Sequence, residues 1–418
     1  MWLEESKSRM PRQGQDNRTA EESDHGHTRS ALAKNLRCSD EELARLELHP
    51  ALASEVVPLG GHEEVGLKAA VFNIRSGFGP ENDREPANVR ARLTQIASAL
   101  LNAGAPDVIG LNEVDFHSHR TGFVDQAQFI AEQLERAGLR YRVVRGPAWL
   151  REESGREIRY GNALLVRHPI VRARHCSFAK LAECDASPTV DNLPHFSLSA
   201  PWSWLSQEPR GVVLADIRWR GHVVRAIVTH LDAFSAQLRE TQAAQIIAGL
   251  VPSDGSVVLL GDMNTVPTRL TLDRTWFSAD RTHDVLTSGR LFDVRSELAG
   301  DDASNWKRWA TYPADNPRWP LDGVFASADL ASVDLGVLGF GLSDHLGLVG
   351  TFLPVTDTSR LNARLERLAL RREGRFRRLQ RCDLPDVGPA SFFSWLRDVT
   401  VPRDKEKTAF ARARSHPR

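Results

Sequence analysis

The sequence predicts an α/β fold with mixed β-sheets, and two observations support this. Short apolar runs that read as strands alternate with longer segments of helical apolar spacing, as is typical of α/β proteins. Some neighbouring strands are joined by a tight turn, as in "GVVLADIRWRGHVVRAIVTHLD" (211–232), which predicts a β-hairpin turning near "RGH". Helical crossovers combined with hairpins indicate sheets that are not purely parallel.

The elements can be assigned in chain order from Leu67. Helices are predicted at 87–104, 124–138 and 235–250, and glycines at 104 and 138 end the first two. Besides the hairpin, apolar runs predict strands at 67–74, 106–115, 139–147, 160–169, 256–262, 321–327, 332–340 and 346–353. Residues 172–210 are expected to be irregular, and they carry Trp202 and Trp204.

Composition divides the 418 residues into three parts. Residues 1–62 are polar and are expected to form a disordered or weakly ordered extension, with one short helix capped by Ser39. Residues 63–355 hold the predicted core. Residues 356–418 form an Arg-rich, partly helical extension, in which Leu361, Leu365 and Leu368 share the helical face expected to dock on the core.

Charge and cysteine content limit which kinds of partner and which cellular compartment the sequence favours. Lys+Arg and Asp+Glu both number 54, so no overall charge favours nucleic acid or an anionic membrane. The four cysteines show no CxxC spacing, and a reduced, cytoplasmic protein is expected. No apolar signal segment or membrane span is evident, and no motif indicates a specific protein partner.

Polar side chains stand at or just beyond the ends of many predicted strands. An unpartnered polar group is costly to bury, and strand ends in α/β folds line ligand crevices, so we expect these side chains to converge. The set comprises Asn73, Glu113, Asn162, His230, Asp262, Asn264, Asp322, Asp344 and His345.

The chemistry of this set indicates a metal-dependent reaction. Carboxylates with few soft ligands suit Mg²⁺ or Mn²⁺, and two histidines can transfer protons. No serine or cysteine has a nucleophile motif, since "GLSDH" is not GxSxG. Together the groups suit hydrolysis of a phosphate ester. Taken singly, each residue also has a structural explanation, such as a turn asparagine, a helix cap or a core histidine.

The order of the motifs resembles the endonuclease/exonuclease/phosphatase superfamily. The motifs are "FNI", "NEVD", "YGNALL", "THLD", "GDMN", "LDGVF" and "SDH", and the resemblance covers about residues 67–354. Pancreatic deoxyribonuclease, apurinic endonucleases, neutral sphingomyelinases and inositol polyphosphate phosphatases belong to it. The resemblance implies a four-layered sandwich of two packed, mixed β-sheets flanked by helices, and phosphoric ester hydrolysis.

The resemblance also implies a role for each motif residue. Glu113 would hold the metal, with Asn73 and Asp344 nearby. Asp262 and Asn264 would orient water and phosphate, and Asp322 would pair with His345. The remaining residues would contact phosphate, with His230 bonding one of its oxygens and Asn162 and Tyr160 completing the pocket.

Several alternatives stay open at this stage. Arg75 stands where apurinic nucleases carry Asp, which weakens the case for a second metal. Either His345 or Asp262 could be the general base. The substrate could be nucleic acid or a sphingomyelin-like phospholipid, and a catalytically inactive scaffold is the alternative of another class. Trp202 and Trp204, like Trp306 and Trp309, could contact substrate or pack in the core.

Overall fold

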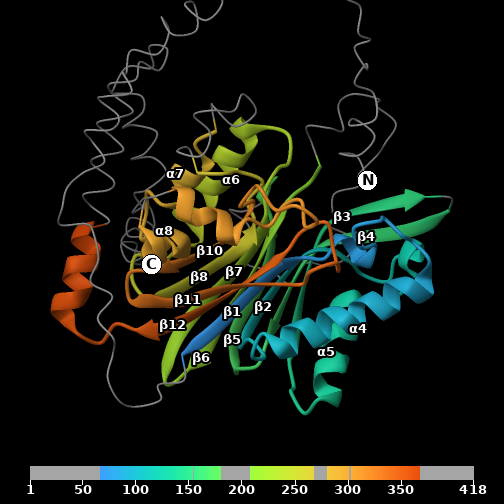
Figure 1. Ribbon diagram of the computed structural model, residues 1–418, viewed down its shortest axis with the longest axis horizontal. Coiled ribbons are helices and arrows are strands. Elements are labelled where there is room, and N and C mark those ends of the chain that lie inside the picture. The colour runs from blue at the N-terminus through green and yellow to red at the C-terminus, as the bar shows by residue number, and fades with distance from the viewer. Residues whose placement is uncertain (1–65, 154, 180–207, 268–279, 301–302, 368–418) are drawn as a thin grey trace, which may run out of the picture. The chain divides into compact units, whose positions relative to one another are not determined.

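Two six-stranded β-sheets pack face to face in the computed structural model, which describes residues 66–153, 155–179, 208–267, 280–300 and 303–367 (Figure 1). The first sheet has the strand order β11-β12-β1-β2-β4-β3, and the second has the order β5-β6-β7-β8-β10-β9. Only β1–β2 and β7–β8 are parallel among the strand pairs in these residues, so both sheets are mixed, as predicted.

The elements have the following bounds. The first sheet comprises β1 (Leu67–Asn73), β2 (Val108–Asp115), β3 (Arg142–Glu153), β4 (Arg156–Val166), β11 (Leu330–Leu338) and β12 (Gly347–Pro354). The second comprises β5 (Ile170–Ser177), β6 (Gly211–Trp219), β7 (His222–His230), β8 (Ser256–Asp262), β9 (Leu291–Asp293) and β10 (Asp322–Ser327). The α-helices are α4 (Pro86–Asn102), α5 (Gln126–Arg136), α6 (Ala236–Gly249), α7 (Thr282–Leu286) and α8 (Val294–Ala299), and 3₁₀ turns are η2 (Arg75–Gly77), η3 (His119–Thr121) and η8 (Ala303–Trp309).

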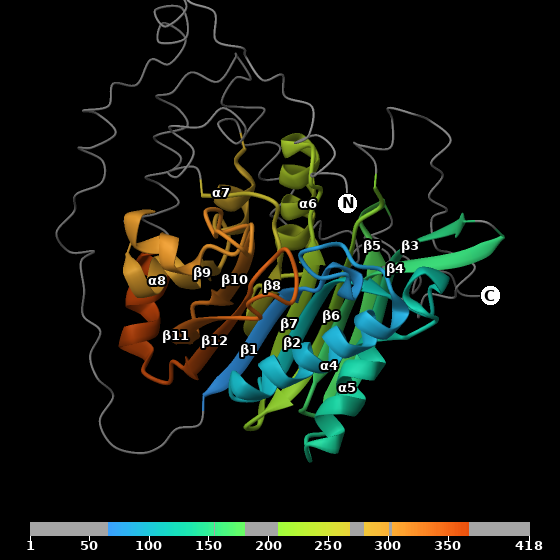
Figure 2. The ribbon, with the colours of Figure 1, turned by 45° about the vertical axis from the view of Figure 1, so that its right-hand side comes forward.

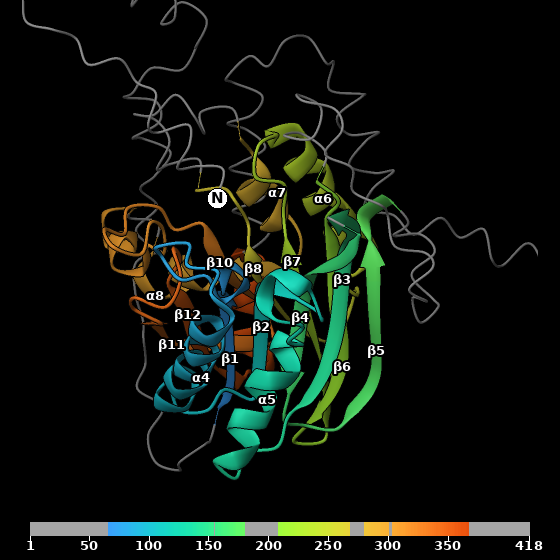
Figure 3. The ribbon, with the colours of Figure 1, turned by 90° about the vertical axis from the view of Figure 1, so that its right-hand side faces the viewer.

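Helices cover the outer faces of both sheets, which completes a four-layered sandwich (Figures 2 and 3). The run "VVLL" in β8 shows why such strands are continuously apolar. Val258 and Leu260 point into the core between the sheets, whereas Val257 and Leu259 pack beneath α6. A strand buried on both faces has no polar side to alternate with the apolar one. The predicted architecture is confirmed.

The two sheets approach each other closely beside β2. A Cβ atom added to Gly110 would lie 2.8 Å from Val228 Cγ2, so only glycine fits between β2 and β7 there. Gly110 lies three residues before Glu113 in the same strand. The close approach therefore fixes how the ends of strands from the two sheets meet.

Two sequence predictions need correction. Residues 172–210 are not all irregular, because β5 pairs with β6 along Ile170–Ser177. Its burial is mixed, so it shows neither a continuous apolar run nor a clean alternation. The expectation of reduced cysteines is wrong for Cys176, which is disulfide-bonded. Short-range spacing rules do not detect such a pairing. Trp306 and Trp309, left open above, are both buried in the domain.

Residues 358–367 form a helix that docks mainly through an arginine (orange-red in Figure 1). Arg364 is buried, pairs with Glu297 and donates to the carbonyls of Ala328 and Leu330. Leu361 packs on the domain, but Leu365 is 37% exposed, so the predicted leucine face is only partly used.

Several expectations fall outside the described residues. They are the extension 1–62, the helix capped by Ser39, Leu368 and the chain beyond it, and Trp202 with Trp204. Within the described part of the chain, none of the helices combines the length and apolar character needed to cross a membrane.

Candidate active site

Asn73, the last residue of β1, joins polar residues from both sheets. Its side chain is fully buried, and Nδ2 donates to Glu113 Oε1 and to Asp262 Oδ2, each at 3.0 Å. Its Oδ1 accepts a hydrogen bond from the backbone of Arg75. One amide at the end of a central strand therefore holds two carboxylates from different sheets close together.

Glu113 is turned toward this point by an irregularity in β2. The pairing of β2 with β4 shifts register between Leu111 and Val114, and Glu113 has φ +58°. Such bulges redirect side chains near functional sites. Burial and the nearby charge of Asp344 raise the pKa of Glu113, although the bond from Asn73 opposes them. A cation placed between the two carboxylates would relieve their repulsion.

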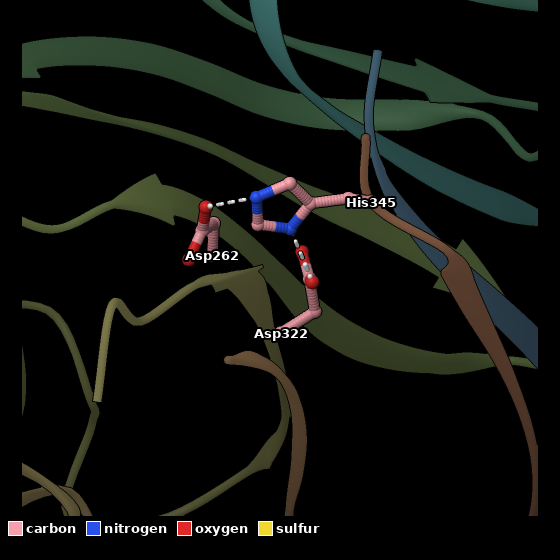
Figure 4. Close-up of side chains that lie close together, drawn as sticks. All are labelled: Asp262, Asp322 and His345. Carbon is pink, nitrogen blue, oxygen red and sulfur yellow. Dashed lines mark hydrogen bonds and ion pairs between the residues drawn. The ribbon is translucent and has the colours of Figure 1, made fainter. Parts of the chain in front are cut away.

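Asp262, Asp322 and His345 form a compact group (Figure 4). His345 Nδ1 lies 2.8 Å from Asp322 Oδ2, and Nε2 lies 3.6 Å from Asp262 Oδ2. Candidate ligand atoms of the three residues lie within 4.8 Å of one another, a spacing that is compatible with binding one metal ion. However, His345 Nδ1 and Asp322 Oδ2 are hydrogen-bonded to each other, so neither atom is available to a metal ion. The geometry therefore fits a proton relay better than a metal site.

The protonation states of this group differ from those of the free amino acids. Burial acts to lower the pKa of His345, but Asp322 and Asp262 outweigh it and raise the pKa well above its usual range. Burial raises the pKa of Asp262 to about 6, against the attraction of His345. At neutral pH the arrangement is therefore an imidazolium beside a carboxylate that titrates just below neutrality.

His230 and Asn264 lie on either side of Asp262. His230, which ends β7, has Nε2 3.5 Å from Asp262 Oδ2 and Nδ1 3.0 Å from Nη1 of Arg210. Burial and the Arg210 charge lower the pKa of His230 well below its usual value. Asn264 donates its backbone N–H to Asp262 Oδ1 and its side-chain amide to the carbonyl of Leu231.

A buried pair of asparagines ties the two sheets together beneath the site. Asn112 donates to Asn162 Oδ1 at 2.8 Å and to the Thr229 carbonyl at 2.9 Å, and its own Oδ1 accepts from the backbone N–H of Asp262. Asn162 in turn donates to the Gly211 carbonyl. Much of the hydrogen-bonding capacity of Asn162, predicted to bind phosphate, is thus used within the protein.

Tyr160 lies at the β3–β4 edge of the site. Its ring stacks on Trp149 with centroids 4.9 Å apart, and Trp149 Nε1 donates to Glu208. Burial and the charges of Glu113 and Glu208 raise the pKa of Tyr160 well above its usual value. The tyrosine is therefore neutral and within electrostatic reach of the candidate metal ligand.

Asp344 precedes His345 and is partly exposed. Its side chain is 27% exposed, and Oδ2 lies 3.3 Å from Nε of Arg75. Arg75 is itself buried, and its Nη1 donates to the carbonyls of Gly79 and Pro80. A fixed positive charge thus lies beside a carboxylate predicted to bind metal.

The sequence-predicted residues thus meet at one end of the sandwich, in contact with one another or joined through neighbouring residues. Sequence reasoning missed the residues that orient them, namely Asn112, Arg210 and Glu208. Asn112 carried one usable signal, since it is an amide inside the apolar run "VIGLNEV". Arg210 and Glu208 stand in the stretch before β6 and carried none.

The chain is similar to one known protein family and to several solved structures. The profile of the Endonuclease/Exonuclease/phosphatase family matches residues 70–345. No curated protein sequence matches the chain. An endonuclease/exonuclease/phosphatase from Beutenbergia cavernae DSM 12333 has a similar structure, with 21% identity, 70% of this chain and 72% of that chain covered, and a TM-score of 0.50.

Two further solved structures are of individually named proteins. One is the mannosyl-6-phosphatase Bt3783 of Bacteroides thetaiotaomicron VPI-5482, with 16% identity, coverage of 69% and 99%, and a TM-score of 0.47. The other is D. rerio TDP2 complexed with a single-strand DNA product, with 16% identity, coverage of 69% and 100%, and a TM-score of 0.44. At these values the similarities concern the fold.

Proposed function

The chain belongs to the endonuclease/exonuclease/phosphatase family, and we propose that it is a divalent-metal-dependent phosphodiesterase. The observation that carries this proposal is the contact of Asn73 with Glu113 and Asp262. Through that amide, a carboxylate suited to a cation lies next to a carboxylate suited to accepting a proton. Hydrolysis of a phosphate ester needs both functions at one place.

The residues present fit a hard divalent cation. The charge of Asp344 helps to raise the pKa of Glu113, and a cation would relieve the repulsion between the two carboxylates. Glu113 and Asp344 would hold Mg²⁺ or Mn²⁺, with Asn73 beside them. When bound, the ion would polarise a phosphoryl oxygen and offset the negative charge that grows there.

We assign the general base to Asp262 and not to His345. A base needs a pKa near the working pH and must be unprotonated, which fits Asp262 with its pKa of about 6. His345 is held protonated between two carboxylates and cannot accept a further proton. In this proposal, Asp262 removes the proton from water, and His345 donates to a phosphate oxygen.

His230 and the amides would hold the phosphate for in-line attack. His230 is buried and neutral, and its Nε2 lies 3.5 Å from Asp262 Oδ2, so a phosphate oxygen bound beside Asp262 would receive its hydrogen bond. Asn264 and Tyr160 would make further contacts with the phosphate, and Asn162, which donates to the Gly211 carbonyl, would support the site from beneath. Orienting groups of this kind supply much of the rate enhancement of such enzymes.

A substrate panel tests the proposal. Full-length protein would be assayed on bis-p-nitrophenyl phosphate, plasmid DNA, RNA, sphingomyelin and inositol phosphates, with Mg²⁺ or Mn²⁺ and with EDTA. We expect metal-dependent cleavage of a diester that EDTA abolishes. The natural substrate class, nucleic acid or phospholipid, follows from which macromolecular substrate is cleaved.

Variants separate an enzyme from an inactive scaffold. Asp262→Asn and His345→Ala should each lower turnover at least a hundredfold with an unchanged circular dichroism spectrum. Glu132→Gln, an exposed helix substitution, is the control and should be fully active. Absence of any metal-dependent cleavage across the panel, together with no heat of Mg²⁺ or Mn²⁺ binding, would support the scaffold alternative.

A further inference from the structure

A chain of side chains runs from β3 to His230 without being used in the proposed chemistry. Trp149 Nε1 donates to Glu208 Oε1 at 3.0 Å, and Glu208 Oε2 lies 2.9 Å from Nη2 of Arg210. Arg210 Nη1 then lies 3.0 Å from Nδ1 of His230. Each link joins a donor to an acceptor: Trp149 and Arg210 both donate to Glu208, and Arg210 also donates to His230.

The chemistry of arginine decides the tautomer of His230. A guanidinium has only donors and keeps its proton in proteins. Because Nη1 must donate, Nδ1 of His230 must present its lone pair, and the single proton of the neutral ring must be on Nε2. That nitrogen is the one directed at Asp262 Oδ2, 3.5 Å away.

Burial makes this constraint strong. The exposed fractions of Arg210 and His230 are 7% and 4%, so water does not compete for the contact. Nε of Arg210 is buried without a hydrogen-bond partner in the described residues, so the two Nη groups alone orient the guanidinium. Both are directed by fixed partners. The low pKa of His230, which burial and the Arg210 charge cause, agrees with a neutral ring.

We infer that Arg210, held by Glu208, is a positioning residue that locks His230 as a neutral imidazole with its proton on Nε2, so that His230 only donates toward the phosphate. The inference rests on the proposed function for its meaning in catalysis. The tautomer itself is a property of the free protein. Arg210 thereby prevents His230 from competing with Asp262 as a base.

The test reads the protonation of each ring nitrogen of His230 directly. Full-length protein labelled with ¹⁵N-histidine would be studied by long-range ¹H–¹⁵N correlation at pH 7 without substrate or metal, and His230→Gln assigns the signals. We expect an unprotonated Nδ1 and a protonated Nε2. A protonated Nδ1 in the parent protein, in either the neutral or the cationic ring, would overturn the inference.

Variants test whether Arg210 is the cause. Arg210→Met alone would leave the carboxylate of Glu208 without its partner, so the double variant Glu208→Gln/Arg210→Met is used as well. In both, Nδ1 of His230 should become protonated in a large part of the molecules. Arg210→Lys keeps a donor and should restore the parent pattern. An Nδ1 that stays unprotonated in the double variant would show that Arg210 does not control it.

Arg225→Met is the matched control. Arg225 lies in β7, the strand that ends at His230. Like Arg210 it pairs with a carboxylate, donating to both oxygens of Asp216, but it does not contact His230. The His230 pattern should be unchanged in this variant. On a diester substrate, Arg210→Met should lower kcat roughly 10- to 100-fold, with partial recovery in Arg210→Lys. The NMR measurement needs no substrate, so it tests the tautomer of His230 independently of whether the protein hydrolyses a diester.

Discussion

Asp322 lies directly opposite Asp262 in the antiparallel pair of β10 and β8, and the imidazole of His345 lies close to both carboxylates. The two carboxylates differ in their contacts. Asp322 Oδ2 bonds His345 at 2.8 Å, whereas Asp262 Oδ2 accepts from Asn73 and lies 3.6 Å from the imidazole. The sheet register therefore sets the distance between a carboxylate that fixes a histidine and the carboxylate that we propose as general base.

Replacing Asp322 with Asn should disable His345 without unfolding the protein. The amide carries no charge, so the attraction that keeps His345 protonated is lost and the pKa of His345 falls. We expect kcat on bis-p-nitrophenyl phosphate to fall by about 10²–10⁴. Asp329→Asn is the control, because Asp329 is a carboxylate just beyond the other end of β10 that bonds Ser256. A fully active Asp322→Asn protein would exclude the relay.

The raised pKa of Asp262 should appear as a pH dependence of stability. The folded protein binds this proton more tightly than the unfolded chain, so the contribution of Asp262 is present below about pH 4 and is lost as pH rises through about 6. The loss is on the order of 3 kcal/mol. Asp262→Asn removes this dependence.

Urea unfolding of both proteins without metal, from pH 4 to pH 8, measures this difference. The free energy of unfolding of Asp262→Asn relative to the parent should increase as pH rises, with most of the change between pH 4 and pH 6. A difference that is constant across this range would mean that burial does not perturb Asp262. The variant should also lack turnover, so the same residue would lower stability and provide activity.

Asn112 should matter for stability because it bonds groups in both sheets. Asn112→Ala would leave the backbone N–H of Asp262, the carbonyl of Thr229 and Oδ1 of Asn162 without this partner, at about 1–3 kcal/mol for each group that finds no other. We expect a loss of about 3 kcal/mol or more in urea unfolding. Asn88→Ala, an exposed helical site, should change stability by less than about 0.5 kcal/mol.

Activity of Asn112→Ala distinguishes a general weakening from a local one. Because Asn112 holds the backbone of Asp262, kcat should fall about tenfold or more at a temperature where the variant is still folded. If kcat were unchanged in the folded variant, Asn112 would support the sheets but not the position of Asp262.

The fold could be predicted from the sequence because its strands are apolar on both faces and its helices stop at glycines. The run "VVLL" in β8 indicates a strand buried on both sides, and it is one. The sequence could not show that β12 pairs with β1 or that β10 pairs with β8, since those registers join residues far apart in the chain. Strand β5 was missed because its burial is mixed.

Some residues of the candidate site could likewise be predicted from the sequence, and others could not. Residues such as Asn73 and Asp262 could be selected because a polar group at the end of an apolar strand needs an explanation. Arg210 and Glu208 could not, because charged residues in a loop are ordinary in a sequence. Their importance comes from burial and from the atoms they face, which only the folded chain provides.

Glu113 should be required for metal binding. In isothermal titration with Mn²⁺, the parent protein should bind, and Glu113→Gln should give no measurable heat. Since burial and Asp344 raise the pKa of Glu113, a proton competes with the ion, and the affinity should increase with pH. Glu132→Gln should bind like the parent. Equal affinity in Glu113→Gln would place the ion elsewhere, for instance at the Asp262–His345 group.

Arg75 should set how tightly the metal binds. Its Nε lies 3.3 Å from Asp344 Oδ2, so a fixed positive charge competes with the ion for that carboxylate. Arg75→Gln should therefore lower the Kd for Mn²⁺ severalfold in isothermal titration. Arg92→Gln is the control, because Arg92 also anchors the η2 turn, donating to the Gly77 carbonyl. Weaker binding in Arg75→Gln than in Arg92→Gln would mean that Arg75 orients Asp344 toward the ion.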